Sequence, residues 1–265
     1  MNLQIEGRRA VVLGGTSGIG RATAELLASQ GTSVVVQGRD KSSGEEVAGR
    51  IRDGGGAAVF AQADLYDYDS VDGVLARCED TFGGLDIVVA SGGQFYPPPQ
   101  EFLSAAPGEL GSVISSRLFH RLNAVHAAAV RMRRRHYGKI ITLTTEAGRT
   151  PTPLESVIGA GSAAVNFLVR AAARELAPEG IRLNNVSVSL TTETPSHERH
   201  LQRVRDQESR GLAGVFTKLE KRAAFGLCSP GDIAPTIVFL ASPLTDKLTG
   251  ATLSINGASS FPAYA

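Results

Sequence analysis

This chain of 265 residues has little of what marks secreted, metal-binding or membrane proteins. Its two cysteines, Cys78 and Cys228, are too few for a disulfide framework, and no cysteine and histidine cluster has metal-ligand spacing. We therefore expect no bound metal and a location in the reducing cytoplasm. No apolar run approaches the roughly 20 residues that span a bilayer, and the first residues lack the pattern of a secretory signal. We expect no membrane association.

Strong charge of either sign is also missing. The chain has 27 basic and 26 acidic residues, a formal net charge of +1. This balance gives no bulk attraction for nucleic acid or for an anionic membrane. With 42% hydrophobic residues the chain can bury a sizeable core. No composition shift or repeat marks a second domain, so residues 1–265 are expected to form one domain.

Short apolar runs alternate with longer segments suited to helices. The expected strands are 8–13, 33–38, 57–62, 85–91, 139–144, 181–188 and 251–255. The expected helices are 19–30, 41–53, 68–82, 109–135, 156–177 and 230–241. Several strands are continuous apolar runs, as in parallel strands buried on both faces. The alternation predicts an α/β fold: a Rossmann-type, doubly wound parallel sheet of about seven strands with helices on both faces.

Two segments do not fit the alternation. A proline-rich loop, 94–99, follows the fourth strand, and a polar, helix-prone excursion occupies 191–222. Ligands of doubly wound sheets bind beyond the carboxyl ends of the strands. The excursion follows such a strand end, so we interpret it as a lid over a substrate site. The alternative is a surface excursion without a role.

A glycine-rich stretch joins the first strand to the first helix. Gly14, Gly18 and Gly20 allow a sharp turn and a close approach of backbone to ligand. The first turn of the following helix offers free N–H groups and a positive dipole end, which suit a pyrophosphate. Because strand, turn and helix follow in order, the stretch predicts a dinucleotide cradle.

The glycine spacing, G-x-x-x-G-x-G, resembles that of the short-chain dehydrogenase/reductase family. Further resembling stretches run along almost the whole chain, at 63–64, 84–89, 138–141, 181–184, 229–234, 239–242 and 248–253. The resemblance implies a nicotinamide dinucleotide held by Gly14, Thr16, Ser17, Gly18, Ile19, Gly20, Arg39, Asp64, Leu65, Ala90, Ser91 and Gly92.

The end of the second strand bears on which dinucleotide binds. An acidic residue there would bond the adenosine ribose and repel a 2′-phosphate. The family's acidic position falls on Gly38, and Arg39 follows it. Because a guanidinium suits a phosphate dianion, we predict NADP(H) rather than NAD(H). Otherwise Arg39 is a solvated residue at a helix start.

The family's catalytic positions have changed. Its Asn, Ser, Tyr and Lys positions fall on Arg117, Thr145, Ile158 and Ser162. An isoleucine cannot donate a proton and a serine supplies no charge, so the family's Tyr–Lys mechanism is not expected. Thr145 and Arg117 remain as candidate catalytic groups. Arg117 would hold a carboxylate or an oxyanion, unless it points to solvent.

Other residues are candidates for the missing proton donor. They are Glu146, Glu155, His120, Tyr96, His197 and His200. The alternative for the two glutamates is an exposed carboxylate, and for His120 it is an ordinary helix residue. Either glutamate could also pair with Arg117.

Three functions remain open. The first is an NADP(H)-dependent oxidoreductase that acts on a carbonyl or alcohol with substitute residues. The second is a non-redox enzyme in the same pocket, such as a lyase, isomerase or cyclase, and the third is a non-catalytic subunit or nucleotide sensor. Arg117 and the proline-lined entrance suggest a hydrophobic substrate with an anionic group. The resemblance implies a homodimer or homotetramer formed through the two long helices; a heteromer with an active relative would favour the third function.

Overall fold

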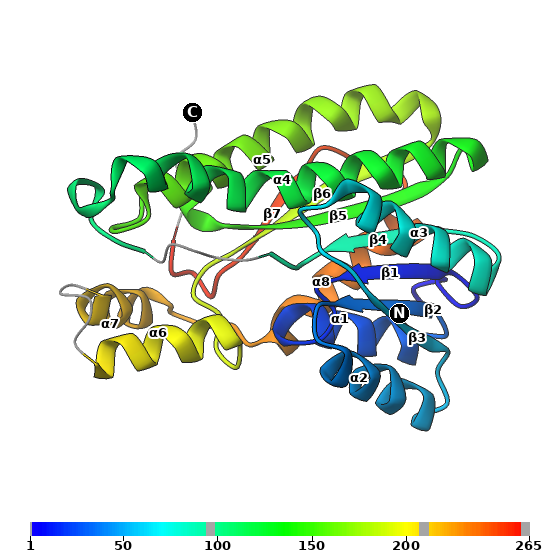
Figure 1. Cartoon of the computed structure of the whole chain (residues 1–265), viewed down its shortest axis with the longest axis horizontal. Helices are drawn as coiled ribbons and strands as arrows, with labels where there is room; N and C mark the ends of the chain where they lie inside the picture. The colour runs from blue at the N-terminus through cyan, green and yellow to red at the C-terminus, as the bar shows by residue number, and fades with distance from the viewer. Residues whose placement is uncertain (1, 94–98, 207–211, 261–265) are drawn as a thin grey trace.

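The computed structural model describes residues 2–93, 99–206 and 212–260, and it confirms the predicted fold class. Among these residues, seven strands form one parallel sheet in the order β3-β2-β1-β4-β5-β6-β7 (Figure 1). The strands are β1 (Arg9–Leu13), β2 (Ser33–Gly38), β3 (Ala58–Gln62), β4 (Ile87–Ala90), β5 (Gly138–Thr145), β6 (Ile181–Val188) and β7 (Thr252–Ile255). The chain order reverses between β1 and β4, and such a switch point is where doubly wound sheets bind ligands.

Helices cover both faces of the sheet, as predicted. On one face lie α3 (Tyr68–Phe82), α4 (Pro107–Met132) and α5 (Ser156–Leu176); on the other lie α1 (Gly18–Ser29), α2 (Lys41–Asp53) and α8 (Pro230–Ala241). Each face has its own cluster of fully buried aliphatic side chains. This two-sided burial explains why the strands are apolar runs without alternation.

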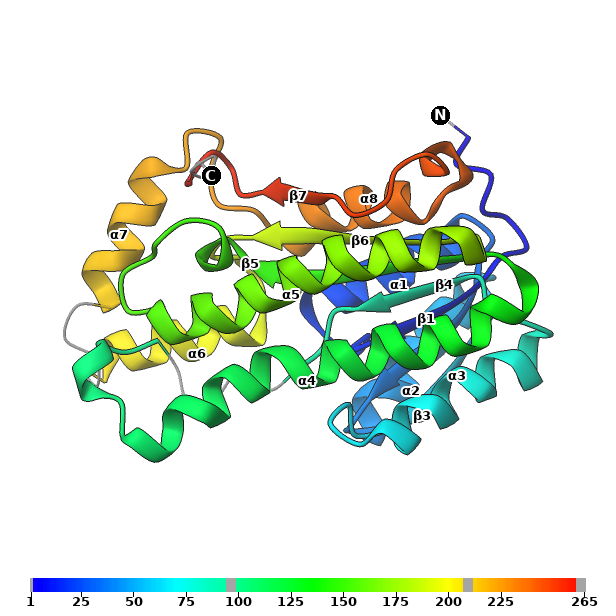
Figure 2. The ribbon, with the colours of Figure 1, turned by 90° about the horizontal axis from the view of Figure 1, so that it is seen from above.

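The polar excursion forms two helices away from the sheet. They are α6 (Pro195–Arg205) and α7 (Leu212–Arg222), and they lie beyond the carboxyl ends of the strands (Figures 1 and 2). Thr194 caps α6, because its side chain accepts a hydrogen bond from the backbone N–H of His197 at 3.1 Å. The position of these helices suits the predicted lid.

One helical segment, Ser156–Glu179, is long and apolar enough to cross a membrane by length and composition alone. It consists of α5 and the short helix that follows it. In the structure α5 packs against α4 and β6, and Val165, Val169 and Ala173 belong to a core cluster. A buried core helix can have the same length and apolar composition as a membrane-spanning helix.

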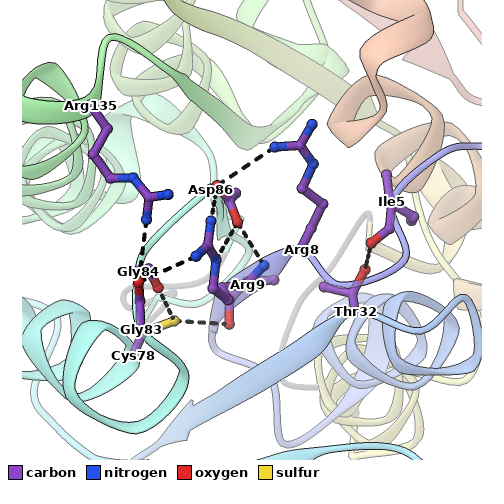
Figure 3. A network of polar contacts seen from close by, with 10 residues as sticks. Ile5, Arg8, Arg9, Thr32, Cys78, Gly83, Gly84, Asp86 and Arg135 are labelled. Atoms are coloured by element: carbon purple, nitrogen blue, oxygen red, sulfur yellow. Dashed lines mark hydrogen bonds and ion pairs between the residues drawn. The ribbon is translucent and has the colours of Figure 1, made fainter.

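An ion-pair network fixes the amino-terminal end of the sheet (Figure 3). Asp86, just before β4, is buried, and it accepts hydrogen bonds from Arg9 Nε at 2.6 Å and from the Arg9 backbone N–H at 2.9 Å. Arg8 lies 3.8 Å from the same carboxylate. Because Arg9 opens β1, the network fixes β1 beside β4 at the end opposite the expected ligand site.

Substituting Asp86→Ala should lower the free energy of unfolding by about 3 kcal/mol, because the guanidinium of Arg9 loses its buried carboxylate. Urea denaturation followed by far-ultraviolet circular dichroism measures this change. The control is Glu46→Ala, which breaks an exposed pair with Arg50 (3.1 Å) and should cost less than about 1 kcal/mol. Equal losses in the two variants would contradict the role given to Asp86.

Candidate functional site

The glycine turn after β1 packs against the chain that leaves β4. Gly14 has φ +76°, and a Cβ atom there would lie 2.2 Å from Cα of Gly92. A Cβ on Gly20 would lie 2.1 Å from the carbonyl oxygen of Gly14. The backbone N–H groups of Ser91 and Gly92 both donate to the carbonyl of Leu13, at 3.0 and 2.9 Å. The structure thus brings Gly14, Gly20, Ser91 and Gly92 together, as the dinucleotide cradle requires.

Helix α1 begins without a side-chain cap. Ser17 precedes it with extended backbone (φ −154°), and its side chain makes no capping hydrogen bond. Among the residues that the structure describes, no side chain accepts a hydrogen bond from the first-turn N–H groups, and an anionic ligand could take that place. A Cβ on Gly18 would lie 3.2 Å from Cγ2 of Thr194, so the start of the α6 segment adjoins the glycine turn.

The end of β2 is also tightly packed. A Cβ on Gly38 would lie 2.4 Å from Cγ2 of Thr16, so an acidic side chain at position 38 would need Thr16 to move. The next residue, Arg39, is exposed, and its backbone carbonyl accepts a hydrogen bond from Gln62. The guanidinium of Arg39 makes no ion pair with the residues that the structure describes.

The residues after β3 reach the same region. Asp64 is exposed, and its carboxylate accepts a hydrogen bond from the backbone N–H of Tyr66 at 3.0 Å. Leu65 is buried, and its Cδ1 lies 2.7 Å from the place of a Cβ on Gly92. Leu65 therefore adjoins the loop after β4, while Asp64 forms a local turn at the surface.

At the carboxyl end of β5 the candidate Thr145 contacts a carboxyl group. Its hydroxyl oxygen accepts from the backbone N–H of Ala147 at 3.3 Å and donates to Oε2 of Glu155 at 3.5 Å. Glu155 is half-buried just before α5. Burial raises the pKa of the Glu155 carboxyl, while Arg117 and the Thr145 hydroxyl oppose the rise. The sequence analysis gave an exposed carboxylate as the alternative for Glu155. In the structure this side chain is only partly exposed.

Arg117 lies within the site. Only 9% of it is exposed, so the alternative that it points to solvent is wrong. Burial lowers the pKa of its guanidinium to about 10, against the opposing effects of Glu155 and Tyr66. Gly161 on α5 allows this close packing, since a Cβ there would lie 2.9 Å from Cβ of Arg117. Arg117 on α4 and Glu155 before α5 therefore interact electrostatically.

Arg121 is a residue that sequence reasoning missed. It is 4% exposed, and its guanidinium donates to the carbonyls of Leu143 and Arg117, the latter at 2.7 Å. Burial lowers its pKa to about 9, and Arg117 adds to the effect. The spacing of four residues from Arg117 places both on one helix face, and this was the available signal.

His120 is buried and contacts the loop after β4, so it is more than an ordinary helix residue. Its Nε2 lies 2.7 Å from a guanidinium nitrogen of Arg121 and 2.6 Å from the place of a Cβ on Gly93. Burial and then the cations Arg121 and Arg117 hold the pKa of the imidazole well below its usual value. His120 is thus neutral near pH 7 and supports the loop after β4.

Ile158 and Ser162 are buried on α5. Ile158 lines a small apolar crevice, whose other residues are Gln100, Glu101, Phe102, Ala105, Val113, Leu154, Ser156 and Val157. Ser162 packs against Gly148, where a Cβ would lie 2.7 Å from the Ser162 Cβ. Neither residue contributes an ionisable group.

Glu146 is a structural residue. It is 3% exposed, which excludes the alternative of a surface carboxylate, and it accepts hydrogen bonds from Ser254 at 2.8 Å and Ser260 at 2.9 Å. It therefore links the end of β5 to the chain around β7. Glu155, and not Glu146, acts on Arg117.

Both lid histidines, His197 and His200, are partly buried, and His200 lies near Arg117. Burial lowers the pKa of His200 to about 4, with further lowering by Arg203, Arg199, His197 and Arg117. His200 is therefore neutral near pH 7 and lies near enough to Arg117 to feel its charge. Tyr96 lies outside the described residues. Within those residues, no group of three or more His, Cys, Asp or Glu side chains is placed to hold a metal ion.

Comparison with known proteins agrees with this architecture. The short chain dehydrogenase family matches residues 8–204. A cis-4-hydroxycyclohexanecarboxylate dehydrogenase from Sinomonas cyclohexanicum is 33% identical, over 94% of this chain and 95% of its own. The 3-oxoacyl-acyl-carrier-protein reductase FabG of Staphylococcus aureus is 31% identical, over 94% and 97%. A solved short chain dehydrogenase/reductase family structure is 35% identical, with a TM-score of 0.78 over 97% and 98% of the two chains.

The fold and the glycine turn define a nucleotide-binding protein of the Rossmann type. More narrowly, the chain belongs to the short-chain dehydrogenase/reductase family of oxidoreductases. The family binds a nicotinamide cofactor and acts on small molecules. The uncapped first turn of α1 and the Gly14–Gly92 contact fit the pyrophosphate of such a cofactor, which supplies or accepts a hydride when bound.

Proposed function

We propose that this protein is an NADP(H)-dependent oxidoreductase with a non-standard catalytic site, acting on a small hydrophobic carbonyl or alcohol that carries an anionic group. The observation that carries the proposal is the grouping of Thr145, Glu155 and Arg117 at the carboxyl end of β5. A hydroxyl, a carboxyl and a guanidinium can bind a substrate oxygen, move a proton and hold an anion. Ile158 and Ser162 supply none of these functions at the family's Tyr and Lys positions.

The substrate class follows from charge. The buried guanidinium of Arg117 favours a carboxylate, and burial strengthens that attraction. A relative that is 33% identical is named for a hydroxycyclohexanecarboxylate, an alcohol with this combination of ring and carboxylate. The apolar crevice beside Ile158 offers a surface for the ring.

Calorimetry and turnover test the proposal together. NADPH and NADH are titrated separately, and NADPH oxidation is then followed with 4-oxocyclohexanecarboxylate and with its methyl ester. We expect tighter binding of NADPH, and faster reduction of the acid than of the ester. Absence of NADPH binding would overturn the cofactor assignment, and equal rates on acid and ester would overturn the role of Arg117.

The cofactor preference gives a specific prediction. Arg39→Ala should weaken NADPH binding about 10- to 100-fold, because one charge-assisted contact to the 2′-phosphate is lost. The affinity for NADH, which has no such phosphate, should be unchanged. Calorimetry on wild type and variant measures both constants. A parallel loss for the two cofactors would indicate damage to the cradle rather than loss of a phosphate contact.

A second candidate function is a nucleotide-binding subunit without redox turnover, or a non-redox enzyme in the same pocket. The observation that favours it is Ile158, an apolar residue facing an apolar crevice where the family places its tyrosine. It predicts NADPH binding without NADPH oxidation. Turnover of a substrate without a change in nicotinamide absorbance would select the non-redox enzyme.

We also propose assembly through α4 and α5. These helices expose large apolar side chains, among them Phe167 at 65% and Phe119 at 49%. Exposed aromatic residues on neighbouring helices favour burial in an interface between subunits. This fits a homodimer or homotetramer, and it also permits a heteromer with an active relative.

A further inference from the structure

The hydroxyl of Thr145 lies between a backbone amide and a carboxyl group. Its oxygen accepts from the backbone N–H of Ala147 at 3.3 Å, and it donates to Oε2 of Glu155 at 3.5 Å when that carboxyl is ionised. The β5 strand holds one partner and the start of α5 holds the other. Catalytic hydrogen bonds are often this long without substrate and shorten when it binds.

Glu155 differs from the other acidic side chains of the protein. Among the described residues it is the one carboxyl group whose pKa is displaced upward; the shifted aspartates, Asp40, Asp72 and Asp232, are displaced downward. Its own shift comes from burial, and the nearby Arg117 moderates it. A carboxyl group that stays protonated nearer to neutral pH, beside a cation that stabilises its ionised form, suits a proton donor.

The charged groups on neighbouring elements leave this role to Glu155. Arg117 on α4 interacts with Glu155, and Tyr66 and His200 in turn interact with Arg117. The hydroxyl of Tyr66 donates to the carbonyl of Ser116 at 2.9 Å. Glu146 and Arg149 lie at the short helix after β5, and Glu101 lines the crevice. Glu146 is held by two serines, and Arg149 donates to Ser254 at 2.5 Å. His200, with a pKa of about 4, is a neutral imidazole near pH 7 and does not act as an acid there.

We propose that Glu155 is the proton donor of this site and that Thr145 positions the Glu155 carboxyl group; the inference rests on the proposed function. A bound reduced nicotinamide would supply the hydride for the new C–H bond at the carbonyl carbon. The carbonyl π pair moves to oxygen, and that oxygen takes the carboxyl proton of Glu155. The resulting carboxylate faces Arg117 and regains a proton from water. Oxidation of an alcohol runs through the same steps in reverse.

The first test needs neither cofactor nor substrate. In a carbon-13 NMR titration of protein labelled at the glutamate carboxyls, one signal should titrate above the ordinary range of glutamate and be absent from Glu155→Gln. Thr145→Val should move that signal to higher pH still, because the hydroxyl bond favours the ionised form. If Glu155 titrates in the ordinary range, the inference is overturned whatever the enzyme does.

The second test measures turnover of 4-oxocyclohexanecarboxylate with NADPH. Glu155→Gln should reduce kcat by about 10²- to 10⁴-fold, with NADPH affinity unchanged by calorimetry, and should remove the alkaline limb of the pH–rate profile. Glu175→Gln, at an exposed glutamate near the end of α5, is the matched control and should keep wild-type kcat. A Glu155→Gln enzyme that retains kcat and pH profile overturns the inference.

The proposed function and this inference fail in different ways. If wild-type protein binds NADPH but reduces nothing, both fail. If the enzyme is active but Glu155 titrates in the ordinary range of glutamate, only the inference fails.

Discussion

Replacing Gly14 with alanine is expected to weaken NADPH binding at least about 100-fold. The new methyl group would lie 2.2 Å from Cα of Gly92, and backbone atoms cannot move aside as a flexible side chain can. The two loops that form the cradle would have to separate, and Gly20, which packs on the carbonyl of Gly14, would move with them. Calorimetry with NADPH measures the loss, and circular dichroism establishes that the variant is folded.

A matched control separates this collision from backbone strain. Gly83 has nearly the same left-handed backbone (φ +79° against +76°), but a Cβ there meets nothing within 4 Å. Both alanine variants should lose about 1 to 2 kcal/mol of stability from the unfavourable φ. Only the Gly14 variant should lose cofactor affinity. If both bind NADPH as wild type does, the glycine turn is not the cradle.

The fold was predicted well because strands and helices are marked by patterns of neighbouring residues in the sequence. Buried parallel strands are short apolar runs, and each expected strand overlaps an observed one; the run 181–188 matches β6 residue for residue. Helix boundaries were less accurate where a cap decides them. Helix α4 begins at Pro107, two residues before the expected start, since Glu109 bonds back to the N–H of Ala106.

The candidate site was only partly predictable because its contacts join distant segments. Glu146 is buried by Ser254 and Ser260, more than a hundred residues further along the chain, and nothing near Glu146 signals this. The proximity of Thr145 and Glu155 depends on how the loop before α5 folds back. Arg121 was also missed, although its contact with Arg117 is local and its helical spacing from that residue was visible in the sequence.

These contacts suggest how charge is arranged in the site. In the family, the cation lies on the helix after the fifth strand, one turn beyond the tyrosine. We propose that Ser162 takes that position here; two buried guanidinium groups, Arg117 and Arg121, lie on the preceding helix. On this proposal the cation lies on α4 instead of α5, beside a carboxyl group in place of a phenol. A carboxyl group needs less help than a phenol to release a proton near neutral pH.

This arrangement predicts that the family's groups can replace Glu155. Starting from Glu155→Gln, adding Ile158→Tyr and Ser162→Lys should restore kcat by about 10²-fold or more. The new tyrosine and lysine would lie four residues apart on one helix face, and the ammonium would lower the pKa of the phenol. Ile158 lines the crevice, which offers the tyrosine ring a place to extend. Ser162 packs closely against Gly148, so the lysine side chain would have to displace that contact.

The control for this rescue is the same triple variant with Ile158→Phe in place of Ile158→Tyr. The two differ by one hydroxyl, so packing and lysine charge are matched, and only the tyrosine form should recover activity. Recovery in both would show that Glu155→Gln had acted through packing. If neither variant recovers activity while both still bind NADPH, a phenol and an ammonium at these positions do not reach the reacting oxygen. That result would show that Ile158 and Ser162 do not occupy the family's catalytic positions.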